Sequence, residues 1–350
     1  MIMAASQQHA LYDATQLTEW VTAAFESMGV PHACARQTAV VLVRTNLRGI
    51  DTHGVARVPS YLEKIVEKEV NTAPRPLAQW RDGVLHFDGD NGLGQYVATQ
   101  AIDQAVERAK QSPVVTCLVK RSGHMGALGQ FVLAAAERGM IALMCQDTPP
   151  LMALPGSSRA AIGNNPIAFA APVAGKAPLL FDMATSVVAR GNLLQAMRDK
   201  RTEIPADWAI GPDGQPTTDP AFALKGAMAP MAGHKGIGLA MLAQVLAGSL
   251  TGSEKVPGAT SSGGNASAFI QVINPDLLIG RQTFDAHMAG WLSLFLDASG
   301  ENGRYPGERA AQCEQERLAR GIPLPASVVQ ELAGLQGMTG QAFSVAPLKS

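Results

Sequence analysis

The segment from Arg48 to Tyr61 holds residue types that could do acid–base chemistry on a substrate with a carboxylate. His53 can donate or accept a proton near pH 7, and Arg57 can bind a carboxylate through two parallel hydrogen bonds. Thr52 places a hydroxyl group next to the histidine. His53 and Arg57 lie four residues apart, so on one helical turn their side chains would face the same way. The alternative interpretation is a plain helix end that closes onto a proline-initiated turn.

Helices are predicted on both sides of this segment. Apolar residues recur at helical spacing from a cap at Asp13 or Thr15 to the stop at Gly29. A second helix is predicted over about residues 33–47, and its end leads into the His53 segment. The first 75 residues therefore indicate a small helical unit with the candidate site at a junction of helices.

From Gly83 onward, short apolar runs bounded by turn residues predict strands. Helices are predicted between some of these strands but not after each one, which favours a mixed sheet over a regular doubly wound one. Past Gln282 the pattern returns to helix, so the helical domain is expected to be discontinuous. The predicted fold is α+β, or mixed α/β, with a helical domain over 8–75 and 303–345 and a sheet domain over 76–302. The predicted strands lie at 114–119, 141–145, 167–171, 179–181 and 268–273, the predicted helices of the sheet domain at 95–110, 131–138, 187–198 and 235–250, and a flexible loop at 256–267.

Composition and charge exclude several classes of function. The chain has 350 residues, 47% hydrophobic content and a formal net charge of −1, without the basic patches of a nucleic-acid-binding protein. Its start has no secretory pattern, and no apolar run is long enough for a membrane span. Four scattered cysteines are expected to be buried free thiols. We therefore expect a cytoplasmic protein that binds neither nucleic acid nor membranes.

Three glycine-rich segments could hold the phosphates of a cofactor, since backbone N–H groups at turns and helix starts bind anions. They lie at 89–94, 123–129 and 233–238. None has the G-x-G-x-x-G spacing and the later acid of a Rossmann site, and none is a P-loop. The second could be an anion site or a tight structural turn. In the third, Lys235 opens a predicted helix, where a cation is unfavourable unless an anion compensates for it.

Metal-dependent and serine hydrolases are poorly supported. His53, His124 and His234 could gather around a metal, but no two of them lie four residues apart as in a preformed helical site. We expect no metal. No G-x-S-x-G motif is present either. Asp182 follows a predicted strand and could be a loop acid or a group of the active site.

Six motifs, in this order, resemble one family. They are Asp-Thr-His-Gly-Val-Ala-Arg, Gly-His-Met-Gly-Ala-Leu-Gly, Gly-Asn-Asn-Pro-Ile-Ala, Phe-Asp-Met-Ala-Thr-Ser, Gly-His-Lys-Gly-Ile-Gly and Tyr-Pro-Gly-Glu-Arg. The chain resembles, from about residue 17 to residue 335, the type 2 malate/L-lactate dehydrogenases. This sulfolactate dehydrogenase-like family includes ureidoglycolate dehydrogenase, diketogulonate reductase and piperideine-2-carboxylate reductase.

The resemblance implies a homodimeric oxidoreductase that transfers a hydride between NAD or NADP and a small 2-hydroxy or 2-oxo acid. It implies a non-Rossmann, largely antiparallel mixed sheet for the cofactor domain. By similarity His53 is the acid–base residue, oriented by Thr52, Arg57 anchors the substrate carboxylate, and Asn164 faces the substrate. Arg190 could be a second carboxylate contact, as a dicarboxylate such as malate would need. The implied cofactor-binding residues are His124, Met125, Gly126, Ala127, Leu128, Phe181, Asp182, Met183, Ala184, His234, Lys235, Gly307, Glu308 and Arg309.

Departures from the family pattern keep alternatives open. Thr52 replaces a usual serine, and Asn164 stands where many members have a threonine. Asn192 stands where the imine reductase has an aspartate, which favours a hydroxy or oxo acid over a cyclic imine carboxylate as substrate. A relative that binds ligands without catalysis is the other alternative. Glu308 favours NAD and Arg309 favours NADP, so the sequence does not choose between them.

Overall fold

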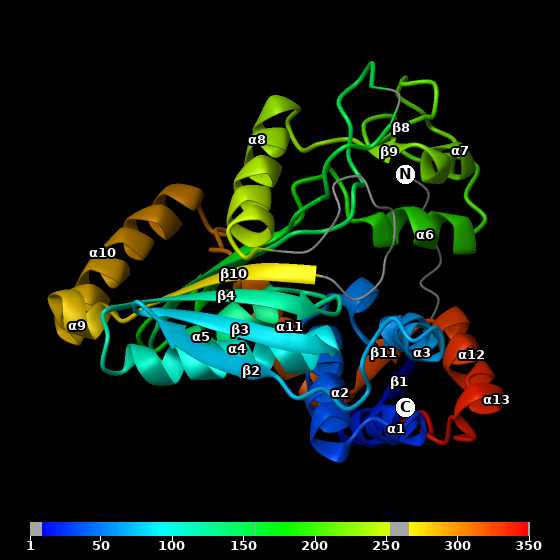
Figure 1. The fold of residues 1–350 in the computed structure, drawn as a ribbon. Coiled ribbons are helices and arrows are strands. Elements are labelled where there is room, and N and C mark those ends of the chain that lie inside the picture. Colours follow the sequence, from blue (N-terminus) through cyan, green and yellow to red (C-terminus); the bar gives the residue numbers. More distant parts are fainter. Residues whose placement is uncertain (1–8, 158, 253–265, 349–350) are drawn as a thin grey trace. The chain divides into compact units, whose positions relative to one another are not determined.

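A computed structural model of the chain describes residues 9–157, 159–252 and 266–348 (Figure 1). The chain divides into two compact units, one made of Met1–Lys68 with Arg309–Ser350 and the other of Glu69–Glu308. Most of the predicted flexible loop, residues 256–265, lies outside the described residues, whereas residues 266 and 267 begin a strand.

The first unit is mainly helical. Asp13 caps its first helix, because the side chain accepts a hydrogen bond of 2.8 Å from the backbone N–H of Gln16. That helix buries an apolar face that includes Leu17, Val21 and Phe25. Its elements are β1 (Ala10–Tyr12), α1 (Ala14–Ser27), α2 (His32–Leu47), α3 (Val58–Val66), α11 (Glu308–Arg320, from Arg309 on), β11 (Ile322–Leu324), α12 (Ala326–Gly334) and α13 (Gln336–Thr339).

The C-terminal segment packs within this unit. Strands β1 and β11 pair antiparallel, with Leu11 opposite Pro323. The indole N–H of Trp20 in α1 donates a hydrogen bond of 2.8 Å to the backbone oxygen of Ala342. Residues from both ends of the chain thus form one small core.

The second unit is built on a seven-stranded sheet in the order β2-β3-β4-β10-β5-β6-β7. Within it β3 and β4 pair parallel, and every other neighbouring pair is antiparallel. This confirms the predicted mixed, largely antiparallel sheet. The strands are β2 (Leu77–Arg81), β3 (Val84–Gly92), β4 (Val114–Ser122), β5 (Ile141–Gln146), β6 (Ile167–Ala171), β7 (Leu179–Met183) and β10 (Ala266–Ile273).

Helices cover both faces of the sheet (Figure 1). Helices α4 (Gly94–Ala109) and α5 (Gly129–Ala136) lie on one face. Helix α8 (His234–Ala243) and the π-helical turn that follows, Gln244–Ser249, lie on the other. On that second face Leu118, Cys145 and Phe269 pack against Ala243 and Ala247. The sheet is therefore the middle layer of this unit.

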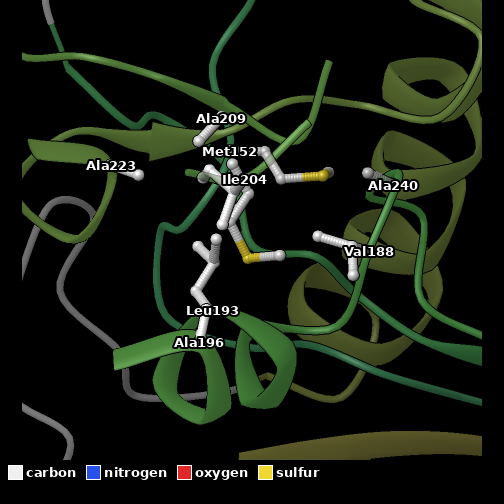
Figure 2. Close-up of a cluster of buried hydrophobic side chains, with 9 residues drawn as sticks. Met152, Val188, Leu193, Ala196, Ile204, Ala209, Ala223 and Ala240 are labelled. Carbon is white, nitrogen blue, oxygen red and sulfur yellow. The ribbon is translucent and has the colours of Figure 1, made fainter. Parts of the chain in front are cut away.

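A smaller core lies beyond one end of the sheet. Figure 2 shows the side chains of Met152, Val188, Leu193, Ile204 and Ala240 gathered in it. The core joins α8 to helices α6 (Arg190–Arg198) and α7 (Pro220–Lys225) and to the short strands β8 (Ala209–Ile210) and β9 (Ala227–Met228).

Two further helices follow the sheet, α9 (Pro275–Ile279) and α10 (Arg281–Ser299). Although α10 has 19 residues, it buries only Phe284 and Leu292. In the described part of the chain, no helix combines the length and the apolar character that crossing a bilayer demands.

Three of the four cysteines are buried as predicted, and one is not. Cys34, Cys117 and Cys145 are buried free thiols, as predicted, and burial raises the pKa of each. Cys313 is only half-buried, because α11 keeps much of its surface in solvent.

Candidate functional site

The His53 segment forms two short 3₁₀ turns, η1 (Asp51–His53) and η2 (Val55–Arg57). Gly54 separates them with φ −91° and ψ −142°, which lies outside the helical region. The expectation that His53 and Arg57 share one helical turn is therefore wrong. The two residues still interact, since the charge of Arg57 acts on the His53 ring.

The environment of His53 keeps its imidazole neutral near pH 7. Burial, and to a lesser extent the positive charge of Arg57, lower the pKa of His53 to about 4. The hydroxyl oxygen Oγ1 of Thr52 lies 3.0 Å from Nδ1 of the ring. A neutral imidazole can accept a proton, so the geometry suits a general base.

Arg57 is the arginine of this segment that suits a ligand. Its Nε atom, like that of Arg48, is buried without a hydrogen-bond partner, and no carboxylate forms an ion pair with Arg57 among the described residues. By contrast, the guanidinium of Arg48, which is 5% exposed, lies 2.5 Å from a carboxylate oxygen of Glu314. Because buried polar groups are usually paired, Arg57 is suited to bind an anion.

Close packing explains the glycine at position 123, the first residue of the turn at residues 123–129. A Cβ on Gly123 would lie 2.9 Å from the backbone oxygen of Gly92, and one on Gly94 would lie 2.4 Å from that of Gly123. The start of α4 and this turn therefore approach closely, backbone against backbone. Met125, Gly126, Ala127 and Leu128 are buried, and His124 is half-buried.

Asp182 supplies the negative charge at the start of α5. Its Oδ2 accepts a hydrogen bond of 2.7 Å from the backbone N–H of Gly129. Burial raises the pKa of Asp182 to about 6, although that hydrogen bond opposes the shift. The anion that the helix start attracts is here a carboxylate of the chain itself.

Phe181 lies on the opposite face of β7 from Asp182, because successive strand residues alternate. Its ring is 37% exposed and contacts Phe169 at 6.1 Å between centroids. Of the predicted cofactor residues on this strand, Phe181 is therefore open to a ligand, whereas Asp182 is engaged with α5.

The start of α8 lies beside the chain that leaves β7. The backbone N–H of Met231 donates to the oxygen of Thr185 at 2.9 Å, and the N–H of Thr185 donates to the oxygen of Asn164 at 3.0 Å. Gly233, with φ 61°, precedes the helix, and no side chain caps its first turn among the described residues. His234 and Lys235 are exposed there. This brings the predicted residues Met183, Ala184, His234 and Lys235 near Asn164, at a helix start that carries the positive charge of Lys235.

The turn at Gly307 packs against the other end of β7. Gly307 has φ 105°, and a Cβ there would lie 2.8 Å from the backbone oxygen of Pro178. An oxygen of Glu308 accepts a hydrogen bond of 2.9 Å from the backbone N–H of Tyr305, so this carboxylate stabilises its own turn. Arg309 and Arg190 are exposed, and no described contact connects either to Asn164.

Sequence reasoning missed Thr148. Its hydroxyl donates to Oδ1 of Asn164 at 3.0 Å, and its backbone N–H donates to Oδ1 of Asn165 at 2.8 Å. The polar run Gln146-Asp147-Thr148 directly after an apolar strand was the available signal. Within the described ranges, no three His, Cys, Asp or Glu side chains gather as metal ligands would.

Comparison with known proteins places the chain in a family. Residues 12–333 match the family model described as malate/L-lactate dehydrogenase. A malate dehydrogenase of Pyrococcus horikoshii is 33% identical over 338 residues, which cover 91% of this chain and 92% of that protein. The NAD(+)-dependent ureidoglycolate dehydrogenase of Escherichia coli O157:H7 is 36% identical over 318 residues, covering 87% and 89%. The solved structure of sulfolactate dehydrogenase from Methanocaldococcus jannaschii has a TM-score of 0.83 at 29% identity, covering 95% of this chain and 98% of that one.

Fold and comparisons together define an oxidoreductase of the dehydrogenase type with a non-Rossmann sheet. The chain belongs to the malate/L-lactate dehydrogenase family. The predicted family, fold class and enzyme class are therefore confirmed. Other relatives are named as an NADP(+)-dependent sulfolactate dehydrogenase and a Δ1-pyrroline-2-carboxylate reductase, so the family uses NAD(+) or NADP(+).

Proposed function

We propose that this NAD(P)-dependent dehydrogenase interconverts a small 2-hydroxy acid and the matching 2-oxo acid, with His53 as acid–base residue and Arg57 as carboxylate anchor. The observation that carries the proposal is a half-buried, neutral histidine beside an arginine that no described carboxylate neutralises. A 2-hydroxy acid has its hydroxyl group one carbon away from its carboxylate. Neighbouring proton-transfer and carboxylate-binding groups suit that arrangement.

The charge of Arg57 affects whether the His53 ring accepts or donates a proton. In the free enzyme His53 is neutral, so it can take the hydroxyl proton of a bound hydroxy acid. A carboxylate on Arg57 would cancel the charge that lowers the pKa of His53, which would help the ring to hold that proton and return it to a carbonyl oxygen. The nicotinamide, when bound, accepts or supplies the hydride.

Residues of the second unit fit a cofactor that carries phosphates. The start of α8 has no side-chain cap among the described residues, and Lys235 adds a positive charge there that an anion would compensate. Phe181 offers an exposed aromatic surface on β7. We propose these residues, with the turns at His124–Leu128 and Gly307–Arg309, as the nucleotide-binding set, for NAD or NADP.

We also propose that the protein is a homodimer. Helix α10 exposes Trp291 (52%), Leu294 (69%) and Phe295 (40%), more apolar surface than a helix in water usually leaves uncovered. Light scattering on the purified protein would test this, and a monomer at micromolar concentration would contradict it. Three buried thiols, Cys34, Cys117 and Cys145, suit a reducing compartment such as the cytoplasm.

A cyclic imine carboxylate is the second candidate substrate, since the chain matches a relative named for such a reductase at 30% identity. Such a compound has the same carboxylate next to the reducible carbon, so Arg57 would bind it equally. Asn192 argues against it, because an amide does not supply the proton that the imine nitrogen needs.

The test is a turnover assay at the nicotinamide absorbance band. Purified protein is mixed with NADH or NADPH and with pyruvate, oxaloacetate, sulfopyruvate or a cyclic imine carboxylate. Turnover of a 2-oxo acid supports the proposal, and turnover of the imine alone replaces it with the second candidate. Cofactor binding without any turnover would instead indicate a non-catalytic relative.

A further inference from the structure

The side chain of Asn46, in the last turn of α2, bonds to the chain on both sides of His53. Its Oδ1 accepts a hydrogen bond of 2.7 Å from the backbone N–H of Val55, and its Nδ2 donates one of 2.7 Å to Oδ1 of Asp51. Asn46 is 1% exposed. One buried amide thus links the two 3₁₀ turns that carry His53 and Arg57.

Gly54 leaves the room that this contact needs. A Cβ at this position would lie 1.9 Å from Oδ1 of Asn46, far inside contact distance. The φ of Gly54, −91°, is not in the left-handed region, so the clash with Asn46 is itself a reason for glycine at this position. The break between η1 and η2 is therefore formed around the amide of Asn46.

Arg317 on α11 completes the arrangement from the far end of the chain. Its guanidinium donates to both oxygens of Asp51, at 2.7 Å and 3.1 Å, and also to the backbone oxygen of Asn46. The paired geometry is the bidentate one that arginine forms with a carboxylate. The same guanidinium thus caps the end of α2 and holds Asp51, two residues before His53.

We propose that Arg317, Asp51 and Asn46 are positioning residues that fix the His53 segment for catalysis. The inference rests on the proposed roles of His53 and Arg57. None of the three needs to touch the substrate: together they hold η1 and η2, and through them the spacing between the imidazole and the guanidinium. A displacement of about 1 Å in such a pair can cost roughly 10²-fold in rate.

The chain offers a matched control on the same helix. Glu314 lies one turn before Arg317 and pairs with Arg44 at 2.8 Å and with Arg48 at 2.5 Å, without a contact to residues 51–57 in the described structure. Glu314→Gln therefore weakens the attachment of α11 to α2 but leaves the His53 segment bonded. This variant therefore shows how far a weaker contact between α11 and α2 lowers stability and kcat when the His53 segment keeps its hydrogen bonds.

The experiment compares Arg317→Met, Arg317→Lys, Asn46→Ala and Glu314→Gln in the full-length protein. We expect kcat to fall by about 10- to 100-fold in Arg317→Met and Asn46→Ala, with partial recovery in Arg317→Lys and little change in Glu314→Gln. Thermal unfolding is measured on all four. If Arg317→Met and Asn46→Ala lose only stability, like Glu314→Gln, and keep kcat, the inference is overturned.

A second readout does not depend on activity. The titration of His53 is followed by NMR, with its signal assigned by its absence in His53→Gln. In Arg317→Met and Asn46→Ala the ring should lose part of its burial and of its closeness to Arg57, so its pKa should rise from about 4 towards the usual value. Unchanged titration would contradict positioning, even if no substrate is found. A wild-type protein without turnover, in which the variants still shift the titration, would refute the proposed function alone.

Discussion

The hydroxyl oxygen of Thr52 lies 3.0 Å from Nδ1 of His53, and the two residues are neighbours in one 3₁₀ turn. This contact engages the Nδ1 nitrogen of the ring and holds the imidazole next to the Thr52 hydroxyl. The orientation of the proposed acid–base residue therefore depends on a hydroxyl group that both threonine and serine supply.

Thr52→Val, which keeps the shape of the side chain but removes the hydroxyl, should lower kcat by about 5- to 10-fold, the value of one net hydrogen bond of about 1 kcal/mol. KM for the substrate should change little, because Thr52 does not bind the carboxylate. Thr52→Ser is the control and should keep kcat. Steady-state kinetics of both variants measure this, and full activity in Thr52→Val would remove Thr52 from the mechanism.

His53→Gln should lower kcat in both directions by about 10²- to 10⁴-fold, the usual contribution of general acid–base catalysis. Cofactor affinity should stay the same, because the residues proposed for the nucleotide lie elsewhere in the chain. Fluorescence titration with NADH and NADPH measures that affinity beside the kinetics. If rate and cofactor binding fall together, His53 has a different role.

Arg57→Met should lower kcat/KM for a 2-oxo acid by about 10²-fold or more, since charge-assisted hydrogen bonds contribute about 1.5–3 kcal/mol each. Arg57→Lys should lie between this variant and the wild type, because it keeps the charge but not the paired geometry. An ester of the substrate acid, which lacks the negative charge, is the control. An equal loss for acid and ester would show that Arg57 does not recognise the carboxylate.

The pH dependence of the rate should differ between the free enzyme, which determines kcat/KM, and the enzyme–substrate complex, which determines kcat. Burial and Arg57 lower the pKa of His53 to about 4, so kcat/KM for oxidation of a hydroxy acid should fall only as pH drops through about 4. A bound carboxylate reduces the effect of Arg57 and raises that pKa, so the acidic limb of kcat should lie at higher pH. Rate profiles at saturating and low substrate separate the two limbs, and the opposite order would contradict the predicted charge coupling.

Asp182→Asn should change how stability depends on pH. The folded state raises the pKa of Asp182 from 3.8 to about 6, so its contribution to stability is fully present below 3.8 and is lost as pH rises through about 6. Asparagine keeps an oxygen for the N–H of Gly129 but has no proton to lose. The Tm of the variant should therefore exceed that of the wild type by a few degrees above pH 6, since about 1 kcal/mol shifts the Tm of a domain of about 150–250 residues by roughly 2–4 °C.

Calorimetry of both proteins at several pH values, without cofactor, measures this difference. Phe181→Leu, on the opposite face of the same strand, is a control in which no pH-dependent difference is expected. A constant difference in Tm across pH would show that Asp182 is not desolvated as its burial indicates.

Local patterns were sufficient for much of the fold. The apolar spacing around Leu17 and the cap at Asp13 predicted α1, and apolar runs predicted strands such as β4 and β5. The short strands β8 and β9 were missed, because two residues each do not form a detectable pattern. The roles of the site residues and the domain boundaries stay predictions.

The sequence by itself determined the residue types of the candidate site, the family and the mixed sheet, because these depend on local spacing and on motif order. Only the tertiary structure decided which groups are available. Arg48 forms an ion pair with Glu314, and Asp182 accepts a hydrogen bond from the start of α5. Arg57, in contrast, lies beside a neutral His53. The tertiary structure also brought Arg317 to Asp51 across 266 positions of the chain. Such pairings, and the burial that shifts a pKa, arise from packing between distant segments, which no local pattern encodes.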